Sequence, residues 1–204
     1  MARPRQFDEA SALAAAIRCF WSRGYEATSV RDLADAMGIT GPSLYNAFGD
    51  KRALYLRAID HYVENGFCDR VRRFENQLAP LAAIAAFFDE IVALSLADTE
   101  HKGCLVVNAA LETAPHDAEF QAALAAVLGD MESFFLRCVQ AGQAAGSVNP
   151  TQPAADLART LLGLLMGLRV LARARPEPAL LRGMVRPVLA LLDAGTTAAP
   201  GSPS

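Results

Sequence analysis

The stretch TSVRDLADAMGITGPSLYNAFGDKRALY, residues 28–55, holds two short helical patterns on either side of a glycine. Ser29, with Asp32 three residues later, forms a capping-box pattern and predicts a helix that ends at Gly38. Thr40 can cap a second short helix, in whose first turn Pro42 is tolerated. Two short helices joined by about three residues predict a helix-turn-helix, whose second helix lies in the DNA major groove. The spacing alone is equally typical of a plain corner between two helices.

Helical spacing of apolar residues continues on both sides of this stretch. Upstream, a helix is predicted to begin at Asp8 or Ser11 and to end at Gly24 in a left-handed stop. Downstream, one long helix is predicted from Lys51 to about Gln77. Further helices are predicted at residues 81–96, 104–113, 115–145, 154–174 and 177–194. The sequence therefore predicts an all-α fold of about nine helices, followed by a disordered tail at residues 196–204.

The overall charge argues against a protein that coats nucleic acid or membrane with its whole surface. The 204 residues carry a net charge of −3, with a pI near 5.6. Residues 1–57 hold eight Lys or Arg against six Asp or Glu, a balance of +2, so the remainder carries −5. This asymmetry permits a small basic face near the N-terminus.

Several classes of protein are disfavoured by what the sequence lacks. The four cysteines are far apart and form no CxxC pair, so a disulfide framework is not expected. The N-terminus has no apolar signal region and no apolar run approaches about 20 residues, which predicts a cytoplasmic protein without a membrane span. Without a phosphate loop, nucleophile elbow, HExxH motif or Rossmann fingerprint, we expect neither an enzyme nor a cofactor.

The residue order around the two short helices resembles the DNA-binding domain of TetR-family (AcrR-type) transcriptional repressors. The matching residues are Phe20 to Tyr25, Thr28, Leu33-Ala34, Met37 to Thr40, Leu44-Tyr45, Phe48 and Lys51. The resemblance covers about the first 57 residues, and Gly41 and Pro42 depart from it where family members often carry polar or basic side chains. It implies an N-terminal three-helix helix-turn-helix DNA-binding domain (1–50), then a helical ligand-sensing and dimerisation domain (51–195).

Residue chemistry within the predicted helix-turn-helix assigns candidate DNA contacts. Thr28 and Ser29 at a helix N-terminus, the Tyr45 phenol, and Lys51 at the start of the long helix suit phosphates. Hydroxyl and amide groups of Thr40, Ser43 and Asn46 suit base edges or sugars. Gly41 and Pro42 supply a rigid start to the helix but few side chains for reading bases, so specificity is expected to rest partly on DNA shape.

One short helix makes few DNA contacts, so repressors of this kind read two half-sites as dimers. The helices at about 154–174 and 177–194 carry large Leu, Val and Met faces, and the resemblance implies that such a pair forms the homodimer interface. It also implies a double-stranded palindromic operator and release of that operator when a small molecule binds.

The middle of the chain is predicted to hold the sensor. Asn108 and Glu112 lie four residues apart on an apolar helix and are expected to face inward, as polar groups of a pocket or as partners of buried backbone. The candidate ligand-binding residues are Phe87, Cys104, Asn108, Glu112, Met131, Phe134 and Met166.

Cys104 supports a second hypothesis. It follows Lys102-Gly103 at the start of a helix, where a cation and the helix dipole favour a reactive thiolate that senses electrophiles or oxidants. Burial as an inert thiol is the competing interpretation. His101, Cys104, Glu112 and His116 match no zinc spacing, so no metal is predicted. A helical interaction module that does not bind DNA is the remaining alternative.

Overall fold

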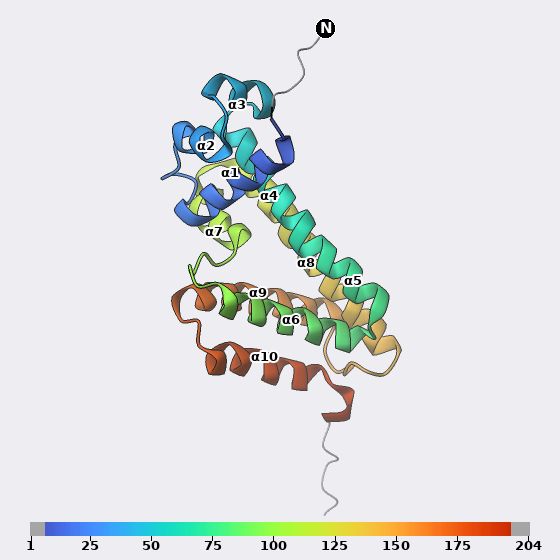
Figure 1. Ribbon diagram of the computed structural model, residues 1–204. Helices are drawn as coiled ribbons and strands as arrows, with labels where there is room; N and C mark the ends of the chain where they lie inside the picture. The colour runs from blue at the N-terminus through green and yellow to red at the C-terminus, as the bar shows by residue number, and fades with distance from the viewer. Residues whose placement is uncertain (1–6, 197–204) are drawn as a thin grey trace, which may run out of the picture. The chain divides into compact units, whose positions relative to one another are not determined.

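The computed structural model of the chain describes residues 7–196, and the predicted all-α fold is confirmed there (Figure 1). The helices are α1 (Glu9–Arg23), α2 (Val30–Met37), α3 (Gly41–Phe48), α4 (Lys51–Val63), α5 (Asp69–Gln77), α6 (Pro80–Ala97), α7 (Leu105–Glu112), α8 (Ala118–Ala144), α9 (Ala154–Ala174) and α10 (Pro178–Leu192). A π turn, Glu64–Cys68, joins α4 to α5 without a break. With that pair counted as one helix, the described chain holds the nine predicted helices. The predicted tail lies, from residue 197 onward, outside the described residues.

Contacts divide the chain into two compact units. Unit 1 extends to Phe67 and includes Cys104–Ala126, so it contains α1 to α4, α7 and the beginning of α8. Unit 2 comprises Cys68–Gly103 and the chain from Val127 onward, with α5, α6, α9, α10 and the rest of α8. The predicted functional division at residue 51 is a different one and stays a prediction.

Side-chain caps set the starts of the four helices of the N-terminal head, which we define as α1 to α4. Asp8, rather than Ser11, caps α1 by accepting bonds from the backbone N–H groups of the next turn. The predicted Ser29 capping box is present, as are caps by Thr40 on α3 and Asp50 on α4. Each cap satisfies N–H groups that the first helical turn leaves without a partner.

Two glycines end the first two helices in different conformations. Gly38 adopts the left-handed α conformation at φ 66° and ψ 30°, as predicted for the turn. Gly24 was expected to do the same, and that prediction is wrong in ψ. Its φ of 84° is positive, but its ψ of 171° is extended, a combination that glycine alone adopts readily because it has no Cβ.

The prediction of one uninterrupted helix from Lys51 to Gln77 needs correction at the π turn. The Asn65 side chain donates to the His61 carbonyl at 2.8 Å, which places a side-chain donor within the helical hydrogen-bond ladder. Apolar residues still face inward on both sides of the turn, since Val63, Phe67 and Val71 are all buried. The apolar pattern therefore continues through the turn, which is why periodicity does not reveal it.

A second break corrects the helix predicted at residues 115–145. A short 3-10 turn, Ala114–His116, precedes α8, and Asp117 lies between them in an extended conformation. Its carboxylate accepts from the backbone N–H groups of Glu119 and Phe120, so Asp117 caps the true start of the helix.

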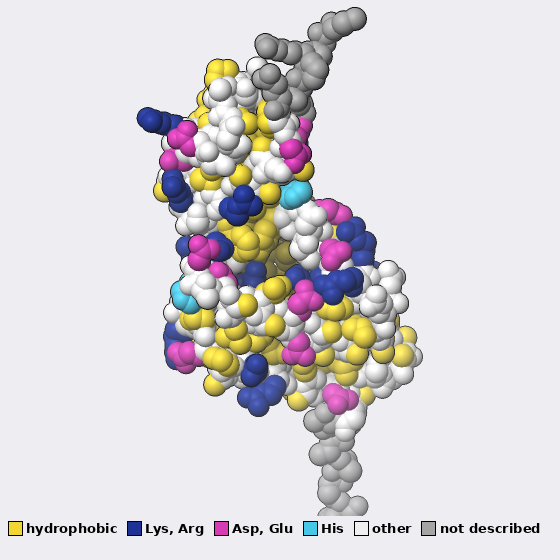
Figure 2. All heavy atoms as spheres, viewed as in Figure 1, with side chains coloured by type: hydrophobic (Ala, Val, Ile, Leu, Met, Phe, Trp, Pro, Cys, Tyr) yellow, Lys and Arg dark blue, Asp and Glu magenta, His cyan; other side chains and the backbone are white. Residues whose placement is uncertain are grey.

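Unit 2 has an aromatic core. Phe87 and Phe88 of α6 contact Phe134 and Phe135 of α8, and the ring centroids of the contacting pairs lie 5.3 to 5.6 Å apart. Among the described helices, α6 alone is long and apolar enough by composition to cross a membrane, but a buried core helix passes the same test. Figure 2 shows further hydrophobic side chains over the face formed by α6, α9 and α10. Val170 of α9 and Leu191 of α10 are 44% and 73% exposed, which leaves apolar surface uncovered in the single chain.

Candidate nucleic-acid interface

The start of α2 presents an exposed hydroxyl beside a carboxylate that is held in its charged form. Ser29 accepts from the backbone N–H of Asp32 at 3.1 Å, and Asp32 accepts from the Ser29 N–H at 2.9 Å. The bond from the Ser29 hydroxyl, then the backbone bond and a weaker effect of Arg23, lower the pKa of Asp32 to about 2. Arg23 lies 2.8 Å from the Asp32 carboxylate and places a cation at the same helix end.

Thr28 takes a different position from the predicted one. Its side chain is fully buried, and its hydroxyl donates to the Gly24 carbonyl at 2.6 Å. The hydroxyl therefore stabilises the loop before α2 and does not face solvent.

Helix α3 exposes most of its predicted contact residues. Thr40, Pro42, Tyr45 and Asn46 are exposed, and the Tyr45 side chain is 53% accessible although Leu44 beside it is fully buried. The Thr40 and Ser43 hydroxyls lie 2.9 Å apart, so they present a paired donor and acceptor. No Lys or Arg lies between Gly41 and Phe48, so α3 offers a ligand only neutral side-chain groups and its own helix N-terminus.

Lys51 is held in place by an aromatic ring. Its Nζ lies 4.1 Å from the centroid of the Tyr25 ring, a cation–π contact that joins the start of α4 to the segment before α2. The Tyr25 ring in turn packs against Phe20, Tyr55 and Phe120. Sequence reasoning missed Tyr25 as the support of Lys51, because the two residues are 26 positions apart and no local motif links them.

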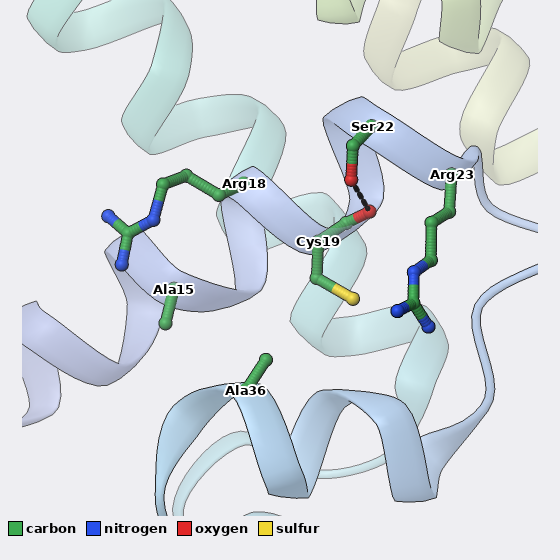
Figure 3. Close-up of a pocket in the computed structure, with 6 residues that line it drawn as sticks. All are labelled: Ala15, Arg18, Cys19, Ser22, Arg23 and Ala36. Atoms are coloured by element: carbon green, nitrogen blue, oxygen red, sulfur yellow. Dashed lines mark hydrogen bonds between the residues drawn. The ribbon is translucent and has the colours of Figure 1, made fainter.

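A small open hollow of about 250 Å³ lies between α1 and α2 (Figure 3). Figure 3 shows Cys19 of α1 and Ala36 of α2 pointing toward one another across it, with Arg18 and Arg23 at its sides. Burial raises the pKa of the Cys19 thiol, so this sulfur is kept protonated. The hollow is too small and shallow for a drug-sized ligand.

The predicted ligand-binding residues are divided between the two units. Phe87, Met131 and Phe134 are buried in unit 2, where the rings of Phe87 and Phe134 lie 5.3 Å apart, and Met166 is partly buried on α9. Cys104, Asn108 and Glu112 belong to unit 1. The structure therefore brings together the aromatic members of the set but does not define one site that contains all seven.

On α7, the half-buried Glu112 binds backbone, as the second of its predicted roles has it, but that backbone is part-buried at Tyr25 and exposed at Glu26 rather than buried. Both carboxylate oxygens accept bonds from backbone N–H groups, those of Tyr25 and Glu26.

Cys104 is buried at the helix start, with the Tyr62 hydroxyl 3.8 Å from its sulfur. Lys102 pairs with Asp98 and Glu100. No group of three or more His, Cys, Asp or Glu in the described residues is arranged to hold a metal.

Together, the capped pair α2 and α3, the glycine turn between them and the lysine at the start of α4 define a helix-turn-helix DNA-binding protein. The chain belongs to the TetR family of transcriptional regulators. The family described as "Bacterial regulatory proteins, tetR family" matches residues 12–58, and "Tetracyclin repressor-like, C-terminal domain" matches residues 80–187. The predicted family is thereby confirmed.

Individual relatives agree over almost the whole chain. An uncharacterised HTH-type transcriptional regulator, YezE of Bacillus subtilis (strain 168), is 32% identical over 195 residues, which is 95% of this chain and 100% of YezE. The HTH-type transcriptional repressor ComR of Escherichia coli (strain K12) is 28% identical, over 84% of this chain and 82% of its own. A cysteine-substituted TetR family regulator, CifR, solved with 26 bp double-strand operator DNA, is 34% identical with a TM-score of 0.83, and the match covers 94% of this chain and 100% of CifR.

Proposed function

We propose that this TetR-family regulator is a repressor that binds a palindromic operator in double-stranded DNA as a homodimer. The observation that carries the proposal is that three successive helices of the head, α2, α3 and α4, begin at side-chain caps. These caps are Ser29, Thr40 and Asp50. Each cap satisfies one N–H group of its helix. The other N–H groups of a first helical turn, with the positive end of the helix dipole, suit phosphates. The similarity to CifR, whose solved complex contains operator DNA, supports this.

Within that head, we assign phosphate contacts to Ser29, Tyr45 and Lys51. All three carry a polar group at or near a helix start or on the exposed face of α3. Thr40, Ser43 and Asn46 are proposed to contact base edges or sugars. Gly41 and Pro42 begin α3 without a polar side chain, and open space surrounds Gly41. Thr28 acts inside the protein, through its bond to Gly24.

The proposed homodimer forms through α9 and α10. Their exposed apolar residues, Val170 and Leu191, would be covered by a second copy, as the apolar core of an oligomer interface requires. Two heads carried by one dimer then reach two half-sites one helical turn of DNA apart.

The proposed effector is a partly apolar small molecule that binds in the cytoplasm and releases the operator. The aromatic cluster of Phe87 and Phe134, with Met131 and Met166, offers the apolar groups that ligand pockets use. Sensing through Cys104 stays a hypothesis, tested by comparing operator release after N-ethylmaleimide in the wild type and in Cys104→Ser. Equal sensitivity of the two would refute it.

A gel-shift titration on DNA from upstream of the protein's own gene tests the proposal. The wild type is expected to give a retarded band at low salt, where phosphate contacts are strongest. Lys51→Ala removes one phosphate contact in each of two heads, so the slope of log K against log salt should become shallower by about 1.8. Tyr45→Phe should weaken binding without changing that slope, because it removes a neutral hydroxyl.

Lys102→Ala is the matched control for this titration, since Lys102 is the other of the chain's two lysines. It makes the same change in net charge in unit 2, where its partners are Asp98 and Glu100. Absence of any retarded band for the wild type at low salt would favour a helical interaction module that does not bind DNA.

A further inference from the structure

The last residue of α7, Glu112, binds the corner between α1 and α2 with both of its carboxylate oxygens. Oε2 accepts from the Tyr25 N–H at 3.1 Å, and Oε1 accepts from the Glu26 N–H at 2.8 Å. Two successive backbone N–H groups that point at one anion form a small anion-binding concavity, and hydrogen bonds to an ionised acceptor are the stronger kind. The contact joins parts of unit 1 that are 86 or more residues apart.

Gly24 has a conformation and a position that make this contact possible. At its φ of 84°, a side chain would be strained. A Cβ at this position would also lie only 2.9 Å from Glu112 Oε2. The corner is therefore shaped to admit the carboxylate closely, which an incidental surface contact would not require.

The corner bound by Glu112 contacts the supports of two residues, Lys51 and Ser29, to which DNA phosphate contacts are assigned. The Tyr25 ring supports the Lys51 ammonium at 4.1 Å. The Gly24 carbonyl accepts from the Thr28 hydroxyl at 2.6 Å, and the Tyr25 carbonyl accepts from the Thr28 N–H at 3.2 Å, immediately before Ser29 caps α2. Displacement of the corner would move both Lys51's support and the start of α2.

The segment that follows Glu112 makes further contacts with the head, at the start of α4 and at the Tyr25 ring. Arg52, next to Lys51, donates from Nε and Nη2 to the two carboxylate oxygens of Asp117 at 3.0 and 2.6 Å. Phe120 of α8 packs edge-on against the rings of Tyr25 and Tyr55, with centroids 5.2 and 5.6 Å apart. The segment from Glu112 to Phe120 thus contacts the head both at the corner after α1 and at the start of α4.

We propose that Glu112 is a positioning residue for DNA binding, which fixes the Gly24 to Ser29 corner so that Lys51 and the start of α2 face the phosphate backbone together. This inference rests on the proposed function. Glu112 itself is assigned no DNA contact, and the two N–H groups bind its negative charge. The C-terminal end of α7 is therefore part of the DNA-binding machinery, although it follows the helix-turn-helix by more than fifty residues.

The direction in which operator affinity changes when the Glu112 charge is removed tests the proposal. Glu112→Gln keeps the shape of the side chain but replaces one acceptor oxygen with an amide that cannot accept, so one N–H loses its partner. Removal of a negative charge should by itself strengthen binding to a polyanion. We expect Glu112→Gln instead to weaken operator binding about tenfold, with a shallower salt dependence.

Asp130→Asn provides the matched control, since Asp130 is an exposed carboxylate of α8 in unit 2 and the substitution makes the same charge change. It should bind the operator as tightly as the wild type or slightly more tightly. Affinities are measured by fluorescence anisotropy on protein shown by circular dichroism to be folded at the assay temperature. Glu112→Asp, which keeps both acceptors on a shorter stem, should show an intermediate affinity and serves as the test if Glu112→Gln does not fold.

Hydrogen exchange at the Tyr25 and Glu26 amides gives a readout that is independent of DNA. Exchange should accelerate in Glu112→Gln and remain unchanged in Asp130→Asn. The inference would be overturned if both Glu112 variants bind the operator with the affinity and salt slope of the wild type although their amide exchange is accelerated. Glu112 would then be a structural cap only. Failure of the wild type to bind DNA would instead overturn the proposed function.

Discussion

Asp32 connects three groups at the start of α2. It accepts from the Ser29 hydroxyl and backbone N–H, and it pairs with Arg23 of α1 at 2.8 Å. A carboxylate in the first turn is favourable to the helix dipole, but it also lies where a phosphate is proposed to bind. Its charge state therefore affects both the stability of the head and the local field that DNA meets.

The titration of Asp32 should be displaced far into the acid range. Its pKa is about 2 in the folded chain, below the ordinary value of 3.8. A lowered folded-state pKa contributes stability above pH 3.8, and this contribution is lost as the pH falls from 3.8 toward 2. NMR titration of the carboxyl carbon should show a midpoint near 2 in the wild type.

Two substitutions separate the causes of that displacement. Ser29→Ala should raise the pKa of Asp32 more than Arg23→Gln does, because the serine bond is the largest of the lowering effects. A wild-type midpoint close to 3.8, or a larger effect of the arginine, would contradict this assignment.

Contacts between near neighbours could be predicted from the sequence, and distant ones could not. Ser29 and Asp32, or Thr40 and Ser43, are three residues apart, so helix geometry alone brings them together. The burial of Thr28 depends on where Gly24 places its carbonyl, and the support of Lys51 depends on Tyr25. Glu112 could be recognised as a polar residue on an apolar helix, but its backbone partners become visible only once the chain has folded.

At the scale of elements, the turn between α2 and α3 depends on Gly38. Its left-handed conformation allows its own N–H and that of Ile39 to reach the last carbonyls of α2, at 3.3 and 3.1 Å. Nothing lies within 4 Å of the position of a Cβ on Gly38, so backbone conformation rather than crowding favours glycine there.

Gly38→Ala should therefore lower the free energy of unfolding by about 1–2 kcal/mol, the strain of a left-handed alanine. Gly41→Ala is the matched control, since Gly41 lies in helical conformation at the start of α3 with open space around it. It should leave the free energy of unfolding unchanged or raise it by up to about 1 kcal/mol, because alanine restricts the unfolded chain. Urea denaturation of both variants measures the difference, and equal costs would show that the conformation of Gly38 is not what stabilises the turn.

The predicted and observed helix boundaries agree where a capping residue or a proline marks the helix start. Residues 154–174 were predicted and found as α9, and Pro178 begins α10 one residue after the predicted start. The π turn at Glu64–Cys68 and the 3-10 turn at Ala114–His116 were missed. The π turn leaves the inward-facing apolar pattern intact, since Val63, Phe67 and Val71 are buried, so periodicity does not reveal it. The 3-10 turn contains no buried residue, so an apolar pattern has nothing to report there.

At the scale of the whole molecule, α9 and α10 are expected to join two copies of the chain. Val170→Arg should give a monomer by light scattering and weaken operator binding by at least about a hundredfold, because a buried unpaired cation disrupts an apolar interface and separates the two heads. Leu78→Arg is the control, since Leu78 is 39% exposed at the end of α5, in unit 2 but outside α9 and α10. A Val170→Arg dimer with wild-type affinity would place the interface elsewhere.

Two heads on one dimer should read two half-sites at a fixed separation. The operator is first located by footprinting on DNA from upstream of the protein's own gene. Its affinity is then measured by fluorescence anisotropy, on the natural site and on the same site with about five base pairs, half a helical turn, inserted between its halves. We expect the insertion to weaken binding by at least about a hundredfold. Single base changes opposite α3 should cost much less, since Gly41 and Pro42 contribute no polar side chain. Unchanged affinity after the insertion, with large losses from single base changes, would contradict both expectations.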